Sequence, residues 1–163
     1  MRRTIEGSRA ILTGASSGIG RALARQLARR QVQLVLTARR QDRLETLADE
    51  LKSCGPAPRL VVGDITDPVT RAELVEAAAE WGALDLLINN AGTGAIGPFV
   101  DASPERLRQI MEVNFFAPAE LIRASVDLLR RGQRPLIVNI GSVLGHRAVP
   151  LKSEYCASKF AMH

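Results

Sequence analysis

The 163-residue sequence contains few aromatic residues, two cysteines and no long hydrophobic run. Aromatic side chains make up 4% of the chain, which leaves little for stacking on nucleic-acid bases. No apolar stretch approaches the roughly eighteen residues that a membrane-spanning helix needs, and no hydrophobic targeting segment is found. These absences favour a cytoplasmic protein with neither a membrane span nor a nucleic-acid partner.

The cysteines and the net charge argue against three further classes of protein: disulfide-rich, metal-binding and nucleic-acid-binding. Cys54 and Cys156 lie far apart without a C-x-x-C partner, so we expect free thiols, no disulfide framework and no metal site. The net charge of +5 comes largely from arginine. Four of these arginines, Arg21, Arg25, Arg29 and Arg30, fall on the expected solvent face of one helix. A solvated basic face, or a field that suits a small phosphate-bearing ligand, is therefore favoured over nucleic-acid binding, which would require strongly salt-dependent affinity.

Short apolar runs alternate with amphipathic segments along the chain. Runs that are apolar on both faces are typical of buried parallel strands, and we expect strands at 9–14, 32–38, 59–62, 85–89 and 134–142. Segments with apolar residues at helical spacing predict helices at 19–31, 41–52, 68–81, 104–131 and 153–163. The alternation predicts one α/β domain over 1–163: a doubly wound parallel sheet with helices on both faces.

Three glycines fall in "LTGASSGIGR", where the first strand is expected to turn into the first helix. Glycine costs backbone order, so Gly14, Gly18 and Gly20 need a reason. The free N–H groups and dipole of a helix start can hold an anion if no Cβ blocks its approach, which indicates a phosphate-binding turn. The spacing G-x3-G-x-G departs from the fingerprint G-x-G-x-x-G, and a tight turn without a ligand stays the alternative.

Polar side chains near the end of the chain could carry proton transfer. Tyr155 and Lys159 lie four positions apart, which places them on one helix face, where an ammonium favours a phenolate. The pair could act as acid and base, although an ordinary helix surface is the alternative. Ser142 follows the apolar part of the fifth expected strand, residues 135–140, where its hydroxyl could orient a carbonyl oxygen or cap a turn. His146 and His163 lack partners at fixed spacing, so we expect both on the surface.

A proline should disturb the long helix expected at 104–131. Pro118 has no N–H and cannot bond to the carbonyl of Asn114, four positions earlier. We therefore expect a local kink within 113–118 and an ordered water on that free carbonyl, reaching toward Lys159.

Four segments follow one another along the chain: "TGASSGIG" at 13–20, "GDIT" at 63–66, "NNAG" at 89–92 and "YCASK" at 155–159. Ser142 precedes Tyr155 by thirteen positions. Together they resemble the motifs of the short-chain dehydrogenase/reductase family: its cofactor turn, its adenine-side segment, the motif after its fourth strand and its Y-x-x-x-K signature. Several motifs in the right order are far more specific than any one of them, and the resemblance implies a Rossmann-like fold.

The resemblance implies an oxidoreductase that transfers hydride between NADP(H) and a carbonyl or alcohol substrate, with Tyr155 as the acid and base. Lys159 would also hold the nicotinamide ribose, and Asn114 would act through a water in the proton relay. The implied catalytic residues are Asn114, Ser142, Tyr155 and Lys159. The implied cofactor-binding residues are Gly14, Ser16, Ser17, Gly18, Ile19, Gly20, Arg39, Arg40, Asp64, Ile65, Asn90, Ala91, Gly92, Tyr155 and Lys159.

The choice of dinucleotide depends on "TARRQDR" after the second strand. An acidic residue there would favour a ribose 2′-hydroxyl, whereas arginine favours a 2′-phosphate. No carboxylate stands at Thr37 or Ala38, and Arg39 and Arg40 offer planar donors. The resemblance makes Arg39 the principal contact, so we expect NADP(H), with two merely solvated arginines as the alternative.

The resemblance also implies that part of the family's fold lies outside these residues. The chain ends at His163, within the helix expected to carry Tyr155, so we expect the C-terminal strands and substrate lid to be missing. The fifth strand would then have an unpaired edge. A nucleotide-binding module or fragment with little turnover is therefore the second hypothesis. Helices starting near Pro104 and Ser153 would form a homo-oligomer interface, and the apolar segments 93–99 and 143–151 suggest a substrate with a hydrophobic body.

Overall fold

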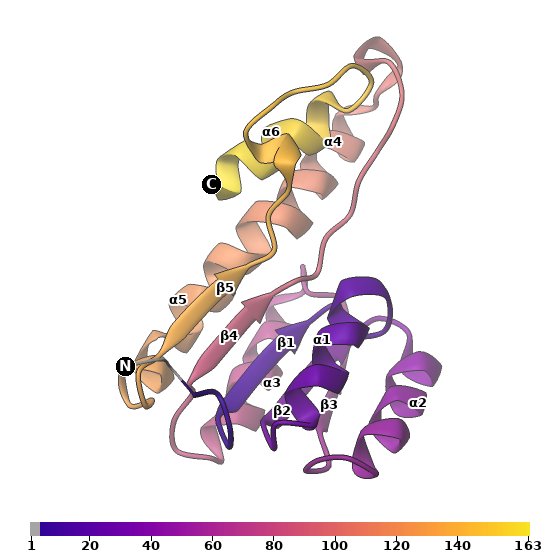
Figure 1. Cartoon of the computed structure of the whole chain (residues 1–163). Coiled ribbons are helices and arrows are strands. Elements are labelled where there is room, and N and C mark those ends of the chain that lie inside the picture. The colour runs from indigo at the N-terminus through magenta and orange to yellow at the C-terminus, as the bar shows by residue number, and fades with distance from the viewer. Residues whose placement is uncertain (1–3) are drawn as a thin grey trace.

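Five parallel strands form one sheet in the computed structural model, which describes residues 4–163 (Figure 1). The strands are β1 (Arg9–Thr13), β2 (Gln33–Ala38), β3 (Arg59–Val62), β4 (Leu86–Asn89) and β5 (Leu136–Asn139). Their order is β3-β2-β1-β4-β5, and all neighbours are parallel. The direction of winding reverses between β1 and β4, which in such sheets opens a crevice at the carboxyl edge.

Helices follow the strands and cover both faces of the sheet. They are α1 (Gly18–Ala28), α2 (Gln41–Lys52), α3 (Pro68–Ala79), α4 (Pro104–Met111), α5 (Ala117–Arg130) and α6 (Ser153–Met162). Two short 3-10 helices, η1 (Phe99–Asp101) and η3 (Val143–Gly145), lie in the loops. Figure 1 shows α4, α6 and the loops beside them extending beyond the carboxyl ends of β4 and β5.

Alternate residues of the central strands supply two separate cores. Leu12 and Leu36 belong to the cluster that packs under α1 and α2, where Leu27, Leu44 and Leu51 are buried. The next or preceding positions on the same strands, such as Ile11 and Val35, face the cluster formed by α3 and α5. A parallel sheet buried on both faces requires this pattern, and the predicted doubly wound α/β fold is confirmed.

The expected helix at 104–131 is interrupted. A π-helix, η2 (Glu112–Phe116), separates α4 from α5, so the expectation of one continuous α-helix is wrong and the local irregularity expected near Pro118 is present. Pro118 cannot donate to the carbonyl of Asn114, which favours a local change of helical pitch. The expected fifth strand is also shorter than predicted, because only residues 136–139 pair with β4.

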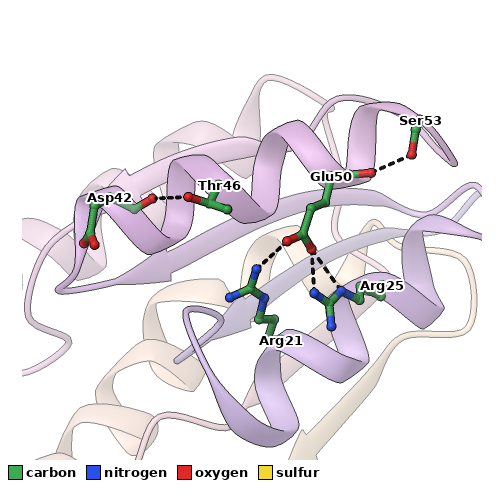
Figure 2. A network of polar contacts seen from close by, with 6 residues as sticks. All are labelled: Arg21, Arg25, Asp42, Thr46, Glu50 and Ser53. Carbon is green, nitrogen blue, oxygen red and sulfur yellow. Dashed lines mark hydrogen bonds and ion pairs between the residues drawn. The ribbon is translucent and has the colours of Figure 1, made fainter.

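Arginines of α1 join that helix to α2. Figure 2 shows the Glu50 carboxylate between Arg21 and Arg25, with Arg25 donating through Nε at 3.0 Å and Nη2 at 2.6 Å. The hydrogen bond from Arg25, with that from Arg21, holds the pKa of Glu50 below its usual range. Arg21 and Arg25 thus lie on the partly exposed face of α1 and pair with Glu50 there, and these half-exposed pairs contribute little to stability.

A buried carboxylate connects three segments at the amino ends of the strands, opposite the carboxyl edge of the sheet. Asp85 accepts from Arg9 Nε at 2.9 Å, Arg9 Nη2 at 3.0 Å and the backbone N–H groups of Arg9 and Gln133 at 2.9 and 2.6 Å. Burial raises the pKa of Asp85, but the hydrogen bonds from Arg9 and Gln133 outweigh it and hold that pKa below its usual range. Asp85 thus fixes the start of β1 against the segment that enters β5.

We expect Asp85→Asn to lower the free energy of unfolding by about 2 kcal/mol at neutral pH, because Arg9 loses its buried counter-charge. The folded-state pKa of Asp85 is depressed, so its stabilisation is present above the unfolded pKa and is lost as pH falls through the folded value. The difference between parent and variant should therefore shrink below about pH 4. Urea unfolding at neutral and acid pH measures it, with Glu50→Gln as the exposed-carboxylate control. Equal midpoints at neutral pH would contradict the role given to Asp85.

No helix within residues 4–163 is long and apolar enough to cross a membrane. The cytoplasmic location expected from the sequence stays a prediction.

Candidate functional site

A cavity of about 950 Å³ lies at the carboxyl edge of the sheet. Its wall is formed by the turn between β1 and α1, by the segments that follow β2 to β5, by Gln109 of α4 and Val113 of the π-helix, and by the first turns of α6. The expected site residues in this wall are Gly14, Ser16, Ser17, Ile19, Arg39, Arg40, Asp64, Ile65, Asn90, Ala91, Gly92, Ser142, Tyr155 and Lys159. Gly18, Gly20 and Asn114 do not belong to the wall.

The turn before α1 leaves donors free at the helix start. Ser17 is the extended residue before the helix, its side chain makes no capping hydrogen bond, and the first turn holds no acidic residue. Gly14 and Gly18 have φ of +68° and +56°, in the left-handed region that favours glycine. The N–H groups and the positive end of the α1 dipole are therefore available to an anion that reaches this side of the cavity.

The three glycines have different tasks. A Cβ at Gly14 would lie 2.8 Å from Cα of Ala91, so Gly14 allows the β1–α1 turn to touch the segment after β4. A Cβ at Gly20 would lie 2.3 Å from the carbonyl oxygen of Gly14, so Gly20 lets the helix pack under the turn. A Cβ at Gly18 would meet nothing within 4 Å. Gly14 and Gly20 thus each allow a close contact within the protein, and the expectation that the glycines make room for a bound phosphate stays a prediction.

Asn90 and Thr13 hold the floor of the cavity. The side-chain amide of Asn90 donates to the carbonyl oxygens of Thr13 at 2.9 Å and Gly14 at 3.1 Å. Thr13 Oγ1 accepts the backbone N–H groups of Asn90 at 3.0 Å and Ala91 at 2.9 Å. These bonds lock the β1–α1 turn to the end of β4. The sequence analysis did not assign Thr13 a role in the site, although Thr13 is the first residue of "TGASSGIG".

Arg39 and Arg40 form one rim of the cavity with different partners. Arg40 Nη2 donates to the hydroxyls of Ser16 at 3.1 Å and Ser17 at 2.8 Å, which holds its guanidinium over the turn before α1. Arg39 Nη1 lies 3.7 Å from Oδ2 of Asp64, and its side chain is 71% exposed. Two guanidinium groups thus border the part of the wall that is formed by the ends of β2 and β3.

Tyr155 and Lys159 lie in the opposite part of the same wall, on α6. The Lys159 side chain is buried, and its Nζ donates to the carbonyl oxygen of Ile140 at 2.9 Å. This Nζ lies 5.8 Å from the centre of the Tyr155 ring. Burial lowers the pKa of Lys159. The half-buried Tyr155 ring lies beside Gly94, where an added Cβ would be 3.5 Å from the ring.

Ser142 caps a turn and also lines the cavity. Its Oγ accepts the backbone N–H of Leu144 at 3.1 Å and so caps η3. The hydroxyl hydrogen is not used in that bond, and the residue lines the cavity with Tyr155. Turn capping therefore leaves the hydroxyl able to donate to a ligand.

Asn114 is buried outside the cavity wall. Its Oδ1 accepts the N–H of Thr93 at 2.9 Å, and its Nδ2 donates to the carbonyl oxygen of Thr93 at 2.8 Å and to Ser158 Oγ at 2.9 Å. Ser158 in turn donates to the carbonyl oxygen of Tyr155 at 2.8 Å. Asn114 therefore connects the π-helix, the segment after β4 and α6. The sequence analysis missed Ser158, although it stands inside "YCASK".

His146 and His163 are exposed as expected, but they are not isolated. Their ring centres lie 3.7 Å apart, a contact that no local pattern predicts because seventeen positions separate the two residues. Among residues 4–163, no group of three or more His, Cys, Asp and Glu gathers as a metal site.

Comparison with known proteins agrees with this geometry. The family model described as short chain dehydrogenase matches residues 8–163. The chain is 36% identical to dehydrogenase/reductase SDR family member 7B of Bos taurus over a 171-residue alignment, which covers 99% of this chain and 52% of the bovine protein. The chain thus spans about half the length of the curated relatives it matches.

Two solved structures are similar throughout the described fold. A short chain dehydrogenase/reductase from Burkholderia phymatum in complex with NAD has a TM-score of 0.93 and 32% identity, over 99% of this chain and 58% of that one. An alcohol dehydrogenase from Thermococcus sibiricus complexed with 5-hydroxy-NADP has a TM-score of 0.89 and 32% identity, over 94% of this chain and 66% of that one.

Proposed function

The chain belongs to the short-chain dehydrogenase family, and from this premise we propose that it is the cofactor-binding and proton-transfer part of an NADP(H)-dependent oxidoreductase. The complete protein would interconvert a carbonyl compound and an alcohol. One observation carries the proposal: a single cavity contains both the turn before α1 and the Tyr155–Lys159 pair. The glycine turn and the acid–base candidates, which are far apart in sequence, therefore border the same ligand space.

The residues of the wall fit a dinucleotide. The uncapped start of α1 suits a pyrophosphate, and the guanidinium groups of Arg39 and Arg40 suit a ribose 2′-phosphate. The Burkholderia relative binds NAD and the Thermococcus relative binds an NADP derivative, so family membership alone does not select the nucleotide. The two arginines support NADP(H) for this chain. When bound, the nicotinamide would supply or take up the hydride.

Three side chains would handle the proton and the substrate oxygen. Tyr155 would donate its phenol proton to the carbonyl oxygen and take it back in the reverse direction. Ser142 would donate its hydroxyl hydrogen to the same oxygen. Lys159, held by the carbonyl of Ile140, would keep a cationic donor near the phenol and bind the nicotinamide ribose.

Asn114 is assigned two contributions. Its side chain orients Thr93 and Ser158 through the hydrogen bonds given above. The water on its backbone carbonyl, expected because Pro118 leaves that carbonyl without its helical donor, stays a prediction. We also propose that α4 and α6 take part in a homo-oligomer of the complete protein, which light scattering of that protein tests.

Nucleotide binding without turnover is the second candidate for residues 1–163 alone. The edge strand β5 exposes Leu136 by 43% and Ile137 by 39%, and the apolar side chain of Val143 in the cavity wall is 78% exposed. Nothing in the part of the chain that the structure describes covers these groups. An opening on the apolar side of the cavity does not prevent a nucleotide from binding, but it lets water reach a reacting carbonyl group. Binding without turnover is therefore favoured for these residues alone.

Fluorescence titration with NADPH and NADH tests the proposal, on preparations of verified intact mass. We expect the complete protein to bind NADPH at least about tenfold more tightly than NADH, and to oxidise NADPH with members of a panel of apolar ketones and aldehydes. The 163-residue chain should bind NADPH more weakly, with little turnover. Absence of NADPH binding by both proteins would reject the proposal, and binding by both without turnover would support the second candidate.

A further inference from the structure

The first turn of α6 carries Tyr155, and its start lacks the usual means of support. Lys152, the residue before the helix, makes no side-chain capping bond. Leu151 before it has φ of +63°, a left-handed conformation that side chains with a Cβ disfavour. A helix end with an uncapped start and a strained entry tends to fray. Another contact must therefore hold this turn in place.

That contact is an ion pair between α4 and α6. The Glu154 side chain is only 1% exposed, and its Oε1 accepts from Arg106 Nε at 2.9 Å and Nη2 at 2.5 Å. The other carboxylate oxygen accepts the hydroxyl of Ser153 at 2.8 Å. The hydrogen bonds from Arg106 and from within the turn hold the pKa of Glu154 below its usual range, so the pair is charged at neutral pH.

Arg106 is itself well anchored. It is the third residue of α4, and its backbone N–H donates to the capping hydroxyl of Ser103 at 3.2 Å. α4 continues directly into the π-helix that carries Asn114, and Asn114 binds Ser158 on α6. The α4–π-helix unit thus holds α6 at Glu154 and again one turn later, on the two sides of Tyr155 in sequence.

We propose that Arg106 and Glu154 are a positioning pair, which fixes the first turn of α6 and so places the Tyr155 phenol in the cavity. The role rests on the proposed function of Tyr155 in proton transfer. None of the motifs that resemble the family includes either residue, and the two are 48 positions apart. A buried carboxylate paired with one arginine is a strong coupling, because loss of the arginine leaves an uncompensated charge next to Tyr155 in sequence.

Few other charges lie near the phenol. Lys159 and Glu154 stand on its own helix, Lys152 directly precedes that helix, and Arg106 comes from α4. The two loops that line the cavity beside the ring contain no charged or titratable side chain over residues 91–98 and 139–145, and the imidazoles of His146 and His163 lie together at the end of the second loop. Removal of the Arg106 charge should therefore be detectable at Tyr155.

The test compares variants of the complete protein by titrating Tyr155 itself. The near-ultraviolet absorbance of the phenolate is followed against pH, and the same titration of the matching Tyr155→Phe protein is subtracted, which isolates this phenol from any other. The variants are Arg106→Gln, Glu154→Gln, the double variant with both amides, and Arg106→Lys. Arg108→Gln is the matched control, because Arg108 is exposed on the same helix. Circular dichroism at each pH verifies folding.

We expect Arg106→Gln to move the ionisation midpoint upward by roughly one pH unit, because the unpaired carboxylate opposes the phenolate. In the double variant, whose amide pair is neutral, and in Arg106→Lys, which keeps the positive charge, the midpoint should return most of the way to the parent value. Arg108→Gln should leave the midpoint unchanged. The complete protein with Arg106→Gln should also lose about tenfold in kcat, while its Kd for NADPH stays within about twofold.

An unchanged midpoint in folded Arg106→Gln, or an equal shift in Arg108→Gln, would overturn the inference even if the protein is an active reductase. If Arg106→Gln does not fold, the Tyr155 midpoints of the double variant and of Glu154→Gln are compared instead. The double variant should have the midpoint of the parent, whereas Glu154→Gln alone should have a lower one. A failure of the proposed function would appear elsewhere, as absence of NADPH oxidation by the parent protein, and would leave the titration interpretable.

Discussion

Replacing Tyr155 by phenylalanine is expected to lower kcat of the complete protein by about a thousandfold, while the Kd for NADPH stays within about twofold. The variant keeps the ring that lies beside Gly94 and within 5.8 Å of the Lys159 ammonium, and removes only the phenol O–H. Proton donation to the substrate oxygen is lost. The contacts proposed for the nucleotide, at the turn before α1 and at Arg39 and Arg40, are untouched.

The measurement is steady-state NADPH oxidation with the best carbonyl compound of the panel, paired with fluorescence titration of NADPH. Ser142→Ala provides a graded comparison, because the Ser142 hydroxyl is proposed to bind the same substrate oxygen without supplying the transferred proton. We therefore expect a smaller loss of kcat in Ser142→Ala than in Tyr155→Phe. The melting temperature checks that the ring still packs. Retention of more than about a tenth of the parent kcat by Tyr155→Phe would remove the phenol from the mechanism.

The fold was predictable because parallel strands have a strong sequence pattern. Runs such as residues 32–38 are apolar on both faces, and the helices between them carry apolar residues at helical spacing. The order of strands and the two-faced core then follow from right-handed crossovers. Boundaries were less predictable: β5 spans only 136–139, although the apolar run is longer and the Ile140 N–H still donates to the carbonyl oxygen of Asn89 at 2.9 Å.

The break in the helix after Met111 shows what one residue type can and cannot predict. Pro118 indicates a missing hydrogen bond to Asn114, and therefore an irregularity. It does not indicate that the backbone adopts a π-helix over Glu112–Phe116, nor that the Asn114 side chain turns to Thr93 and Ser158. Those contacts depend on the packing of α6 against the π-helix, which joins residues 44 positions apart.

The candidate site was predictable where it consists of short motifs. The glycine turn and the Tyr155–Lys159 pair are local patterns, and the structure brings both to one cavity. Contacts between distant segments had no such signal. The Thr13 hydroxyl under the turn and the Arg106–Glu154 pair became visible only once the sheet and the helices were assembled.

Replacing Arg39 by aspartate is expected to raise the Kd for NADPH by about a hundredfold and the Kd for NADH by less than about threefold. Arg39 is expected to contact the 2′-phosphate, and its side chain is 71% exposed, with Asp64 as a distant partner at 3.7 Å. A loosely held guanidinium can turn toward a phosphate at little cost. A carboxylate at the same position would repel the phosphate dianion and tolerate a ribose hydroxyl.

Arg40 provides the internal comparison for Arg39. Its guanidinium is already held by the hydroxyls of Ser16 and Ser17, so Arg40→Asp removes a charge from the same rim and also disturbs the turn before α1. We expect Arg40→Asp to weaken NADPH and also, more than Arg39→Asp does, NADH, because both nucleotides share the pyrophosphate. The ratio of the two Kd values should therefore change most in Arg39→Asp.

Arg43→Asp is the matched control for charge alone. Arg43 is exposed on α2, one turn beyond the rim, and does not line the cavity. It should change the Kd values of NADPH and NADH equally and by less than about threefold, as expected for a screened surface charge. Equal weakening of both nucleotides by Arg39→Asp would reject the 2′-phosphate contact at this residue. The NADP(H) preference would then depend on Arg40 or be absent.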